Sequence, residues 1–452
     1  MRCDRLELPL RRFGGGVTDV YPTRGLSRGG PYAIPEEVRK SREVSVVPIF
    51  VRVPEFKEYQ EFMNAAKAFL EKLREEFRRY FRIVMKVHEE REVTISSLYL
   101  PEDLRTLYNK LRRVKTELSE LYGDKEVGQV AVLIFTRWTP EYQKLTPYYI
   151  SKCVFGSEVA SQVVTEVAFS NFDMSLANVS LGIFAKIGGI PWVLAEPLSA
   201  DVIAGVGRTT VKYRESRQAE VSKDYIGSVA IVGSDGVVSE VRAKVVSEPE
   251  ELSGWISSNV RRAARSFALS KGTKEVRLSV HYSGKKPSIE ELRELSKAIE
   301  DLESEGLRAS YRVLHVTDDI NVRLLCEESK YYPTSGLYCI TSDREAYLTP
   351  LGALKLGTRE HYSFTGIPRT LKVSLIHTSE SGTLEELTEG LREAYWGTFM
   401  HLAGAQININ EPITTKYSRD VAYLVGSTAI AERSLGIACS IAKDVYERPW
   451  FL

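Results

Sequence analysis

The sequence predicts a mixed α/β protein in which two different α/β folds follow one another along the chain. Between residues 129 and 187, apolar runs typical of buried strands alternate with helical segments, and this order indicates a parallel sheet. After residue 197 the order changes to three successive strands, which are followed by a helix, a strand, a helix and a strand. A chain of 452 residues is long enough for two or three domains and a large core.

The part of the chain before residue 129 contains a loop-like leader, one strand and two helices. Glycine and proline are frequent in residues 1–40, so we expect a segment that wraps over a domain. Residues 44–53 are apolar and indicate a strand, and Pro48 within them predicts an edge strand or a bulge. Apolar residues at helical spacing predict a helix over 57–88 and a second one over about 101–121.

The alternating part follows directly. Its elements are a strand at 129–136, a helix at 141–155, a strand at 160–165 and a helix at 172–187. Gly188 and Gly189 end the last helix, and Pro191 and Pro197 mark the boundary to the next domain. Ligands of such sheets bind at the carboxyl ends of the strands.

The second half begins with strands at 202–206, 227–232 and 237–246, and Ser234-Asp235-Gly236 is a hairpin signal between the last two. A helix at 249–269, a strand at 275–282, a helix from Ser288 to about 304 and a strand at 307–315 follow. Ser288 and Glu291 form the capping box of the second helix. This order is that of a ribonuclease-H-like fold.

Composition excludes several classes of protein. The 61 Lys and Arg residues balance 60 Asp and Glu residues, and 43% hydrophobic residues are typical of globular proteins rather than disordered ones. The five cysteines contain no CxxC pair, which argues against a disulfide framework and against a cysteine-ligated metal. No apolar run is long enough to span a membrane, and the N-terminal residues lack the apolar core of a signal peptide. We therefore expect a soluble, cytoplasmic protein.

Ribonuclease-H-like nucleases need carboxylates at the ends of their first and fourth strands, because these hold the catalytic metal ions. Here the first strand ends in Gly207-Arg208 and the fourth is followed by Ser283-Gly284, so neither end carries an acid. Asp201 lies at the wrong end of its strand, and Asp235 is accounted for by its turn. The sequence predicts a nuclease fold without nuclease carboxylates.

A group of polar residues in the first fold is typical of phosphate binding. Tyr148 and Lys152 are four residues apart and share one helix face, Gln162 begins the next strand, and Lys186 lies in the last turn of the following helix. The ring of Tyr148 offers a surface on which a base can stack. The alternative is structural, because a lysine in a last turn is favoured by the helix dipole alone.

Several segments resemble the signature of Argonaute and Piwi proteins. Residues 148–152, Gln162 and residues 178–189 resemble the MID domain, whereas residues 202–207, 280–284, 366–373 and 417–422 resemble the PIWI domain. The leader around Phe13 is similar to that of short prokaryotic (archaeal-type) members, and no PAZ domain fits ahead of residue 40. The implied domains are a wrapping segment (1–40), a Rossmann-like MID domain (41–197, with a helical insertion at about 57–121) and a ribonuclease-H-like PIWI domain (198–452).

The resemblance implies a site for the 5′-phosphate of a short guide strand. The family residues that hold this phosphate match Tyr148, Lys152, Gln162 and Lys186, and the residue that contacts the next nucleotide matches Asn178. A divalent cation, Mg²⁺ in the first instance, is expected to bridge guide phosphates through the carboxylate of Leu452, in an apolar ending expected to be tucked into the protein. Gly182 departs from the family, which carries Gln or Lys there, and so removes one ligand.

The resemblance also implies a protein that is not an enzyme. The family's catalytic acids match Gly207, Ser283 and Arg419, and the position of its glutamate is not identified. We expect a short guide, RNA in preference to DNA, capture of a complementary DNA strand without cleavage, and defence against invading DNA with a partner and an effector protein. Two alternatives stay open: a divergent metal-dependent endonuclease whose acids are Asp318 and Asp319 or lie elsewhere in the chain, and a scaffold that has lost guide binding.

Overall fold

The structure is a computed structural model in which two compact units are distinguished. It describes residues 2–54, 56, 58–98, 100–126, 129–137, 146–213, 222–319, 321–325, 327, 332–356, 359–362, 368–439 and 449–452. Unit 1 comprises residues 1–11, 193–401 and 406–422, and unit 2 comprises residues 12–192, 402–405 and 423–452. Residues 423–452 lie in unit 2.

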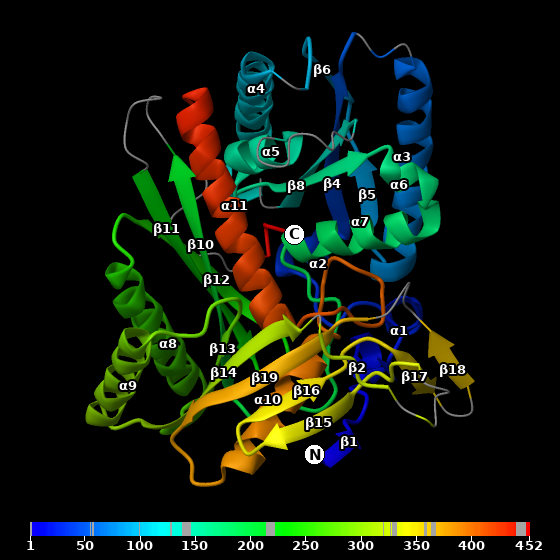
Figure 1. The fold of residues 1–452 in the computed structure, drawn as a ribbon. Helices are drawn as coiled ribbons and strands as arrows, with labels where there is room; N and C mark the ends of the chain where they lie inside the picture. The colour runs from blue at the N-terminus through cyan, green and yellow to red at the C-terminus, as the bar shows by residue number, and fades with distance from the viewer. Residues whose placement is uncertain are drawn as a thin grey trace. The chain divides into compact units, whose positions relative to one another are not determined.

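Unit 2 contains a parallel sheet in the order β5-β4-β7-β8, with β6 also paired to β4 (Figure 1). Its elements are β3 (Thr18–Asp19), α1 (Pro22–Gly29), α2 (Glu36–Ser41), β4 (Glu43–Arg52), α3 (Tyr59–Phe81), β5 (Val84–Val87), β6 (Arg91–Thr94), α4 (Pro101–Glu126), β7 (Val130–Thr136), α5 (Pro147–Phe155), β8 (Ala160–Thr165), α6 (Val167–Ser170) and α7 (Phe172–Lys186). The predicted alternation of strands and helices is confirmed, although residues 141–145 of the predicted helix lie outside the described residues.

The prediction of an edge strand at Pro48 is wrong, because β4 lies inside the sheet between β7 and the pair β5 and β6. On that side β5 pairs with β4 up to Val46, and β6 pairs with it from Ile49 onward. Pro48 lies in the interval where neither strand pairs, so its missing N–H interrupts no ladder there.

Two further expectations for the N-terminal part are corrected. The helix expected over 57–88 ends at Phe81, where Arg82 adopts φ 57° and its N–H bonds the Arg78 carbonyl. The residues that follow form β5 and β6, so the expected helical insertion contributes two strands to the sheet. The leader is not loop-like throughout, because α1 and α2 form within it.

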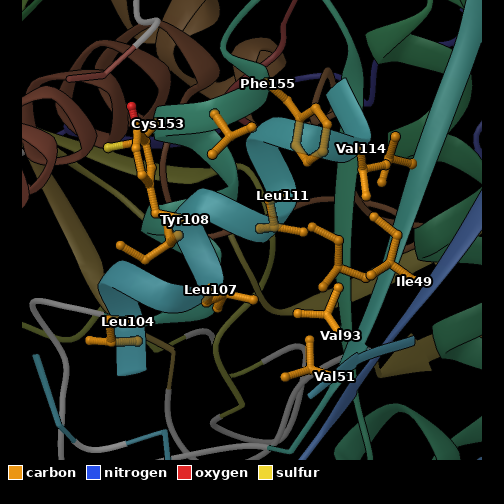
Figure 2. Packing of buried hydrophobic residues seen from close by; sticks show 14 of the residues in the cluster. Ile49, Val51, Val93, Leu104, Leu107, Tyr108, Leu111, Val114, Cys153 and Phe155 are labelled. Carbon is orange, nitrogen blue, oxygen red and sulfur yellow. The ribbon is translucent and has the colours of Figure 1, made fainter. Parts of the chain in front are cut away.

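The core of unit 2 lies between the sheet and the helices α4 and α5. Figure 2 shows Leu107 and Leu111 of α4 facing Ile49 and Val51 of β4 and Val93 of β6. The α4 residues that share this buried face recur every three or four positions; they are Leu104, Leu107, Tyr108, Leu111, Val114 and Leu118. Packing on this face fixes the position of α5, which carries Tyr148 and Lys152.

Unit 1 is built on a nine-stranded sheet in the order β1-β15-β16-β19-β14-β13-β10-β11-β12. Its elements are β1 (Arg2–Arg5), β9 (Val193–Leu194), β10 (Val202–Tyr213), β11 (Ser222–Gly233), β12 (Val238–Val246), α8 (Glu250–Lys271), β13 (Glu275–Tyr282), α9 (Ile289–Ser304), β14 (Arg308–Asp319), β15 (Leu337–Ser342), β16 (Glu345–Leu348), β17 (Ala353–Leu356), β18 (Arg359–Tyr362), β19 (Thr370–Thr378) and α10 (Thr383–Gly397). The chain passes between the units in β2 (Arg11–Arg12) and α11 (Ile413–Leu435), and a single 3-10 turn covers Gly14–Gly16.

The strands β10 to β14 have the predicted ribonuclease-H-like arrangement. β10, β11 and β12 form an antiparallel meander, whereas β13 and β14 run parallel to β10. The capping box of Ser288 and Glu291 is present at the start of α9. The four further strands of the sheet were not predicted.

Helices cover both faces of this sheet. Apolar residues of α8 pack in one cluster with Val202, Ala204 and Val206, which are alternate residues of β10. Helix α9 lies beside α8 (Figure 1) and packs against β14. The opposite face meets α10 and the first turns of α11, where a Cβ on Gly205 would lie 2.0 Å from the Thr414 oxygen. The glycines of β10 therefore let the backbone of α11 approach the strand closely.

The structure contradicts the expectation of no disulfide framework. β1 pairs with β15 so that Cys3 lies opposite Cys339, and these two residues form a disulfide. Cys153 of α5 forms a second disulfide with Cys439. The partners are 336 and 286 residues apart in the sequence, so no local spacing signals them.

Among the helices of the described residues, none combines the length and apolar character that a membrane crossing requires.

Candidate nucleic-acid interface

Four of the five residues predicted to bind a guide come together in unit 2. Tyr148 and Lys152 lie one turn apart on α5, Gln162 lies on β8, and Lys186 is the last residue of α7. Both lysines are buried, with 1% and 3% of their surface exposed. Lysine is almost never buried to this degree unless its amino group has hydrogen-bond or charge partners.

The two lysine side chains meet at one main-chain oxygen. The Nζ atoms of Lys152 and Lys186 donate to the Ser161 carbonyl oxygen at 3.2 and 2.9 Å. Lys186 Nζ also donates to Gln162 Oε1 at 2.5 Å. Helices α5 and α7 thus direct two amino groups to one point on β8.

Residues 450–452 provide the remaining acceptors. Lys152 Nζ donates to the carbonyl oxygen of Trp450 at 2.5 Å and lies 3.4 Å from that of Leu452. The hydroxyl of Tyr148 donates to the Phe451 carbonyl oxygen at 2.6 Å. Trp450 and Phe451 are buried, which confirms that these apolar residues are tucked into the protein.

The electrostatics of this group favour an anion. Burial lowers the pKa of Lys152 to about 7, although hydrogen bonding with Lys186 raises it. Burial and the charge of Lys152 lower the pKa of Lys186 well below its ordinary value. Within the described residues neither lysine forms an ion pair with an Asp or Glu side chain. An incoming anion would supply the countercharge that no described Asp or Glu side chain supplies.

Asn178 does not join this group. Its Oδ1 accepts a hydrogen bond from the backbone N–H of Ala405 at 2.8 Å, so it anchors the 402–405 segment within unit 2. Its predicted contact with a guide nucleotide stays a prediction.

The same cluster of residues offers few ligands to a cation. Gly182 contributes no ligand, and a Cβ there would lie 3.2 Å from Gln162 Oε1, which already accepts a bond from Lys186. The Leu452 oxygen has Lys152 Nζ as its neighbour. In the described part of the chain, no group of three His, Cys, Asp or Glu side chains is placed to hold a metal ion. The donor set of this chain therefore does not by itself fit a divalent cation.

The three positions matched to the catalytic acids lie in unit 1. A Cβ on Gly207 would lie 2.3 Å from the main-chain carbon of Ser418 and 2.4 Å from its oxygen. Ser283 Oγ is 3.5 Å from the Val206 oxygen, and Arg419 pairs with Glu411 at 2.6 Å. The backbone of α11 thus occupies the space that a side chain at position 207 would need.

The nearby acids already have partners. Asp318, one of the two residues of the alternative nuclease, pairs with Arg369 at 2.7 Å, and Asp319 accepts the backbone N–H of Asn321. Asp201 Oδ2 accepts the backbone N–H of Arg277, and Asp235 caps its own hairpin turn through Val237. These contacts support the structural interpretation of Asp201 and Asp235.

Sequence reasoning missed the groups that complete the two regions. The acceptors of the lysine pocket are main-chain oxygens of Ser161, Trp450 and Phe451, and a main-chain oxygen has no residue-type signature. Arg208 pairs with Glu291 at 2.6 Å, and the capping-box glutamate was the only signal for that pair.

The fold is similar to those of solved Argonaute and Piwi structures. Against the crystal structure of A. aeolicus Argonaute the TM-score is 0.63 at 18% identity, with 99% of this chain and 55% of that chain covered. Against Aa-Ago with externally bound siRNA it is 0.62 at 18% identity, with 99% and 56% covered. Against Drosophila Piwi it is 0.65 at 14% identity, with 100% and 56% covered.

The chain therefore spans little more than half the length of these proteins. No protein-family model and no curated sequence matches the chain. The predicted fold class, a Rossmann-like parallel sheet followed by a ribonuclease-H-like sheet, is confirmed, and this chain has the fold of Argonaute and Piwi proteins.

Proposed function

We propose that the protein binds the 5′-phosphate of a short nucleic-acid guide and captures a complementary strand by base pairing, without cleaving it. The observation that carries this proposal is the convergence of the buried Lys152 and Lys186 on the Ser161 oxygen, where neither lysine is paired with a described Asp or Glu side chain. A terminal phosphate monoester carries up to two negative charges, whereas an internal phosphodiester carries one. Two ammonium groups match the terminal phosphate.

The pocket has the groups that such a phosphate needs. Lys152 and Lys186 would donate to its oxygens, and the Tyr148 hydroxyl would add a third donor. Lys152 Nζ lies 5.4 Å from the centre of the Tyr148 ring, so a base stacked on that ring is within reach of the phosphate site. These donors now bond carbonyl oxygens of residues 450–452, and the guide phosphate would replace some of those bonds.

The proposal includes finer points that rest on the resemblance. We propose an RNA guide and a DNA target, action against invading DNA in the cytoplasm, and an associated partner and effector protein. The assignment of residues 41–197 to a MID-like domain and 198–452 to a PIWI domain belongs to the same proposal. The crystal structure of Aa-Ago with siRNA supports a nucleic-acid ligand for that protein and, by likeness of fold, motivates one here.

Magnesium belongs to the proposal only as a bridge between guide phosphates, because the chain's own donors do not fit the ion. Leu452 is the residue that would contact it.

The proposal that the protein does not cleave its target rests on two residues of unit 1, Gly207 and Arg419. Gly207 leaves no space for a carboxylate beside Ser418, and Arg419 brings a cation to the third matched position. Metal-dependent phosphodiester cleavage needs clustered acids, and these residues do not provide them.

The test compares one short RNA with and without a 5′-phosphate at fixed salt, with magnesium or with EDTA. We expect the wild-type protein to prefer the phosphorylated strand by about 100-fold or more, because two charge-assisted contacts contribute about 3 kcal/mol or more together. Lys152→Met and Lys186→Met should each remove most of this preference. Lys72→Met, which changes an exposed lysine of α3, is the matched control and should keep it.

Two outcomes would contradict the proposal. Equal, weak binding of both strands would favour a scaffold that has lost guide binding. Magnesium-dependent cleavage of a guide-matched target would favour a divergent nuclease.

A further inference from the structure

A disulfide in unit 2 joins the helix that carries Lys152 to the segment that leads toward residues 450–452. Cys153 follows Lys152 directly on α5 and is bonded to Cys439. Ten residues, 440–449, separate Cys439 from Trp450, whose carbonyl oxygen accepts a hydrogen bond from Lys152. Residues 450–452, the latch, are therefore attached to α5 both by hydrogen bonds and, through the preceding chain, by the disulfide.

The latch occupies donors that a bound phosphate would use. Lys152 Nζ donates to the Trp450 carbonyl oxygen at 2.5 Å, and the Tyr148 hydroxyl donates to that of Phe451 at 2.6 Å. Trp450 and Phe451 are only 2% and 4% exposed, so the latch is packed into unit 2 and covers these bonds. A phosphate that binds Lys152 and Tyr148 must first break them, and the latch therefore competes with it.

A thiol can reach this disulfide from one side. Cys153 is fully buried in the core of unit 2, whereas Cys439 is only partly buried against that core. Disulfide exchange begins when a thiolate attacks an accessible sulfur atom, which here is Cys439 Sγ. Outside hyperthermophiles, the disulfides of cytoplasmic proteins are usually transient and serve catalysis or redox sensing.

Other contacts hold the residues just before Cys439. Arg105 of α4 donates to the Leu435 carbonyl oxygen at 2.6 Å, and the Tyr108 hydroxyl donates to that of Ala438. The backbone N–H of Cys439 donates to Glu432 Oε1 of α11 at 2.9 Å. Opening the disulfide should therefore release the chain beyond Cys439 and leave the end of α11 in place.

We propose that the disulfide between Cys153 and Cys439 is a redox switch of the 5′-phosphate site. While the disulfide is closed, it holds the latch on Lys152 and Tyr148. When a dithiol reduces it, the latch leaves and the site binds a 5′-phosphate more tightly. This inference rests on the proposed function, because the guide phosphate is the ligand with which the latch competes.

The reduction proceeds by two exchange steps. One thiolate of the dithiol attacks Cys439 Sγ, the S–S bond breaks, and Cys153 leaves as the free thiol. The second thiol then attacks the mixed disulfide and releases Cys439. The two cysteines gain two electrons and two protons, and the dithiol is oxidised to its own disulfide.

The switch acts on the effective concentration of the latch. A covalent link beside the site makes rebinding of the latch an intramolecular event that starts from a fixed point on α5. Without the link, the chain toward Trp450 starts from hydrogen bonds on α4 and α11, which open and close. The phosphate then meets a weaker competitor.

The test measures the affinity for a short 5′-phosphorylated RNA before and after reduction by dithiothreitol, in EDTA and at fixed salt. We expect the wild-type protein to bind about tenfold more tightly after reduction, because the phosphate no longer replaces one or two hydrogen bonds of the latch. Cys439→Ser should bind like the reduced wild-type protein in both conditions. Cys339→Ser opens the other disulfide, in unit 1, and as the matched control should respond to dithiothreitol like the wild-type protein.

Hydrogen exchange measured by mass spectrometry locates the change. Peptides that contain the latch should exchange faster after reduction and in Cys439→Ser, whereas those of the buried strand β7 should keep their protection. Non-reducing peptide mapping shows in each sample whether Cys153 and Cys439 are joined.

Three results would overturn this inference alone if the preference for a 5′-phosphate is intact. They are an unchanged affinity after the bond opens, weaker binding after reduction, and free thiols at Cys153 and Cys439 in protein kept under oxidising conditions. A wild-type protein that shows no preference for the 5′-phosphate in either redox state would instead overturn the proposed function.

Discussion

Gly207 and Ser418 are so close that position 207 accommodates no side chain. A Cβ atom at Gly207 would lie 2.3 Å from the main-chain carbon of Ser418, and a second contact of 2.6 Å would involve the backbone nitrogen of Arg419. Since the obstacle is backbone of α11 and not the end of a flexible side chain, local adjustment cannot remove it. The hydroxyl of Ser228 also bonds the Ser418 oxygen and fixes this contact from the neighbouring strand.

The first prediction is that Gly207→Asp destabilises the protein and does not create nuclease activity. Overpacking of a close contact costs about 1–3 kcal/mol, and a clash with backbone should lie at or above the upper end. Urea unfolding measures the change, and a guide-matched target with magnesium or manganese tests cleavage. Gly254→Ala on α8 is the control, because its Cβ would meet only Glu294 Oε2 at 3.8 Å, so its effect should stay within about 1 kcal/mol. Cleavage by a stable Gly207→Asp variant would contradict the proposed reason for inactivity.

The second prediction concerns pH and the 5′-phosphate pocket. In the free protein the pKa of Lys152 is lowered to about 7 by burial, and a bound phosphate would raise it again by supplying a negative charge. Binding above pH 7 must therefore take up a proton, and affinity for the phosphorylated strand should fall as pH rises from 7 to 9, by up to about tenfold per pH unit.

The groups around Lys152 are Lys186 of α7, the Ser161 oxygen of β8, Tyr148 of its own helix and carbonyl oxygens of residues 450–452. Calorimetry in buffers of different ionisation enthalpy measures the proton uptake. Lys152→Met should remove the part of the pH dependence that comes from Lys152, and Lys186, whose pKa burial also lowers, would supply the rest. Lys72→Met should preserve the whole pH dependence. A flat affinity from pH 6 to 9 in the wild-type protein would show that the pocket binds no proton with the phosphate.

The third prediction concerns the acid stability of unit 1. Burial raises the pKa of Glu393, but the charge of Arg312 and the hydrogen bond with His281 outweigh it and lower the pKa to about 2, from an ordinary value of 4.5. The carboxylate thus contributes stability that is fully present above about pH 4.5 and is lost as pH falls through 2. This difference corresponds to about 3 kcal/mol.

Urea unfolding at pH 7, 4 and 2.5 tests whether the contribution of Glu393 to the free energy of unfolding decreases as the pH falls. Glu393→Gln should lower the free energy of unfolding at pH 7 by a few kcal/mol and flatten its dependence on pH in the acid range. Glu385→Gln changes an exposed residue of the same helix and should leave the pH dependence as in the wild-type protein. An identical acid profile in all three proteins would contradict the role of Glu393.

The fourth prediction concerns the disulfide between Cys153 and Cys439. It closes a loop of 286 residues and joins the segment after α11 to α5, the helix that carries Tyr148 and Lys152. Under non-reducing conditions Cys439→Ser should lower the stability of unit 2 by about 2–4 kcal/mol, and the wild-type protein in dithiothreitol should approach the variant. Thermal unfolding with and without the reductant measures this, and non-reducing peptide mapping shows whether the two cysteines are joined. Equal stability of the oxidised wild-type protein and the variant would show that this disulfide does not stabilise unit 2.

The sequence by itself determined the kind and order of most elements between residues 129 and 315. The buried strand at β7, the capping box of α9 and the meander of β10 to β12 are properties of short segments, because periodicity and capping act over a few residues. The sequence also predicted that Tyr148 and Lys152 share one face of a helix, because they are four residues apart.

The tertiary structure decided where those side chains point and what completes them. Ser161, Trp450 and Phe451 enter the pocket through main-chain oxygens, and Asn178 is directed to Ala405 instead. Pro48 occupies an interior strand because its partner changes from β5 to β6 at that point, which no local pattern encodes.

Position 207 illustrates the difference between what the sequence predicts and what the tertiary structure decides. The sequence shows that an acid is missing there, but only the packing of α11 on β10 shows that no side chain fits. Contacts between residues about 200 or 300 positions apart depend on how whole elements pack, and chain-local preferences do not fix that packing. Local chemistry therefore determined the elements and the candidate residues, whereas long-range packing decided the geometry in which they act.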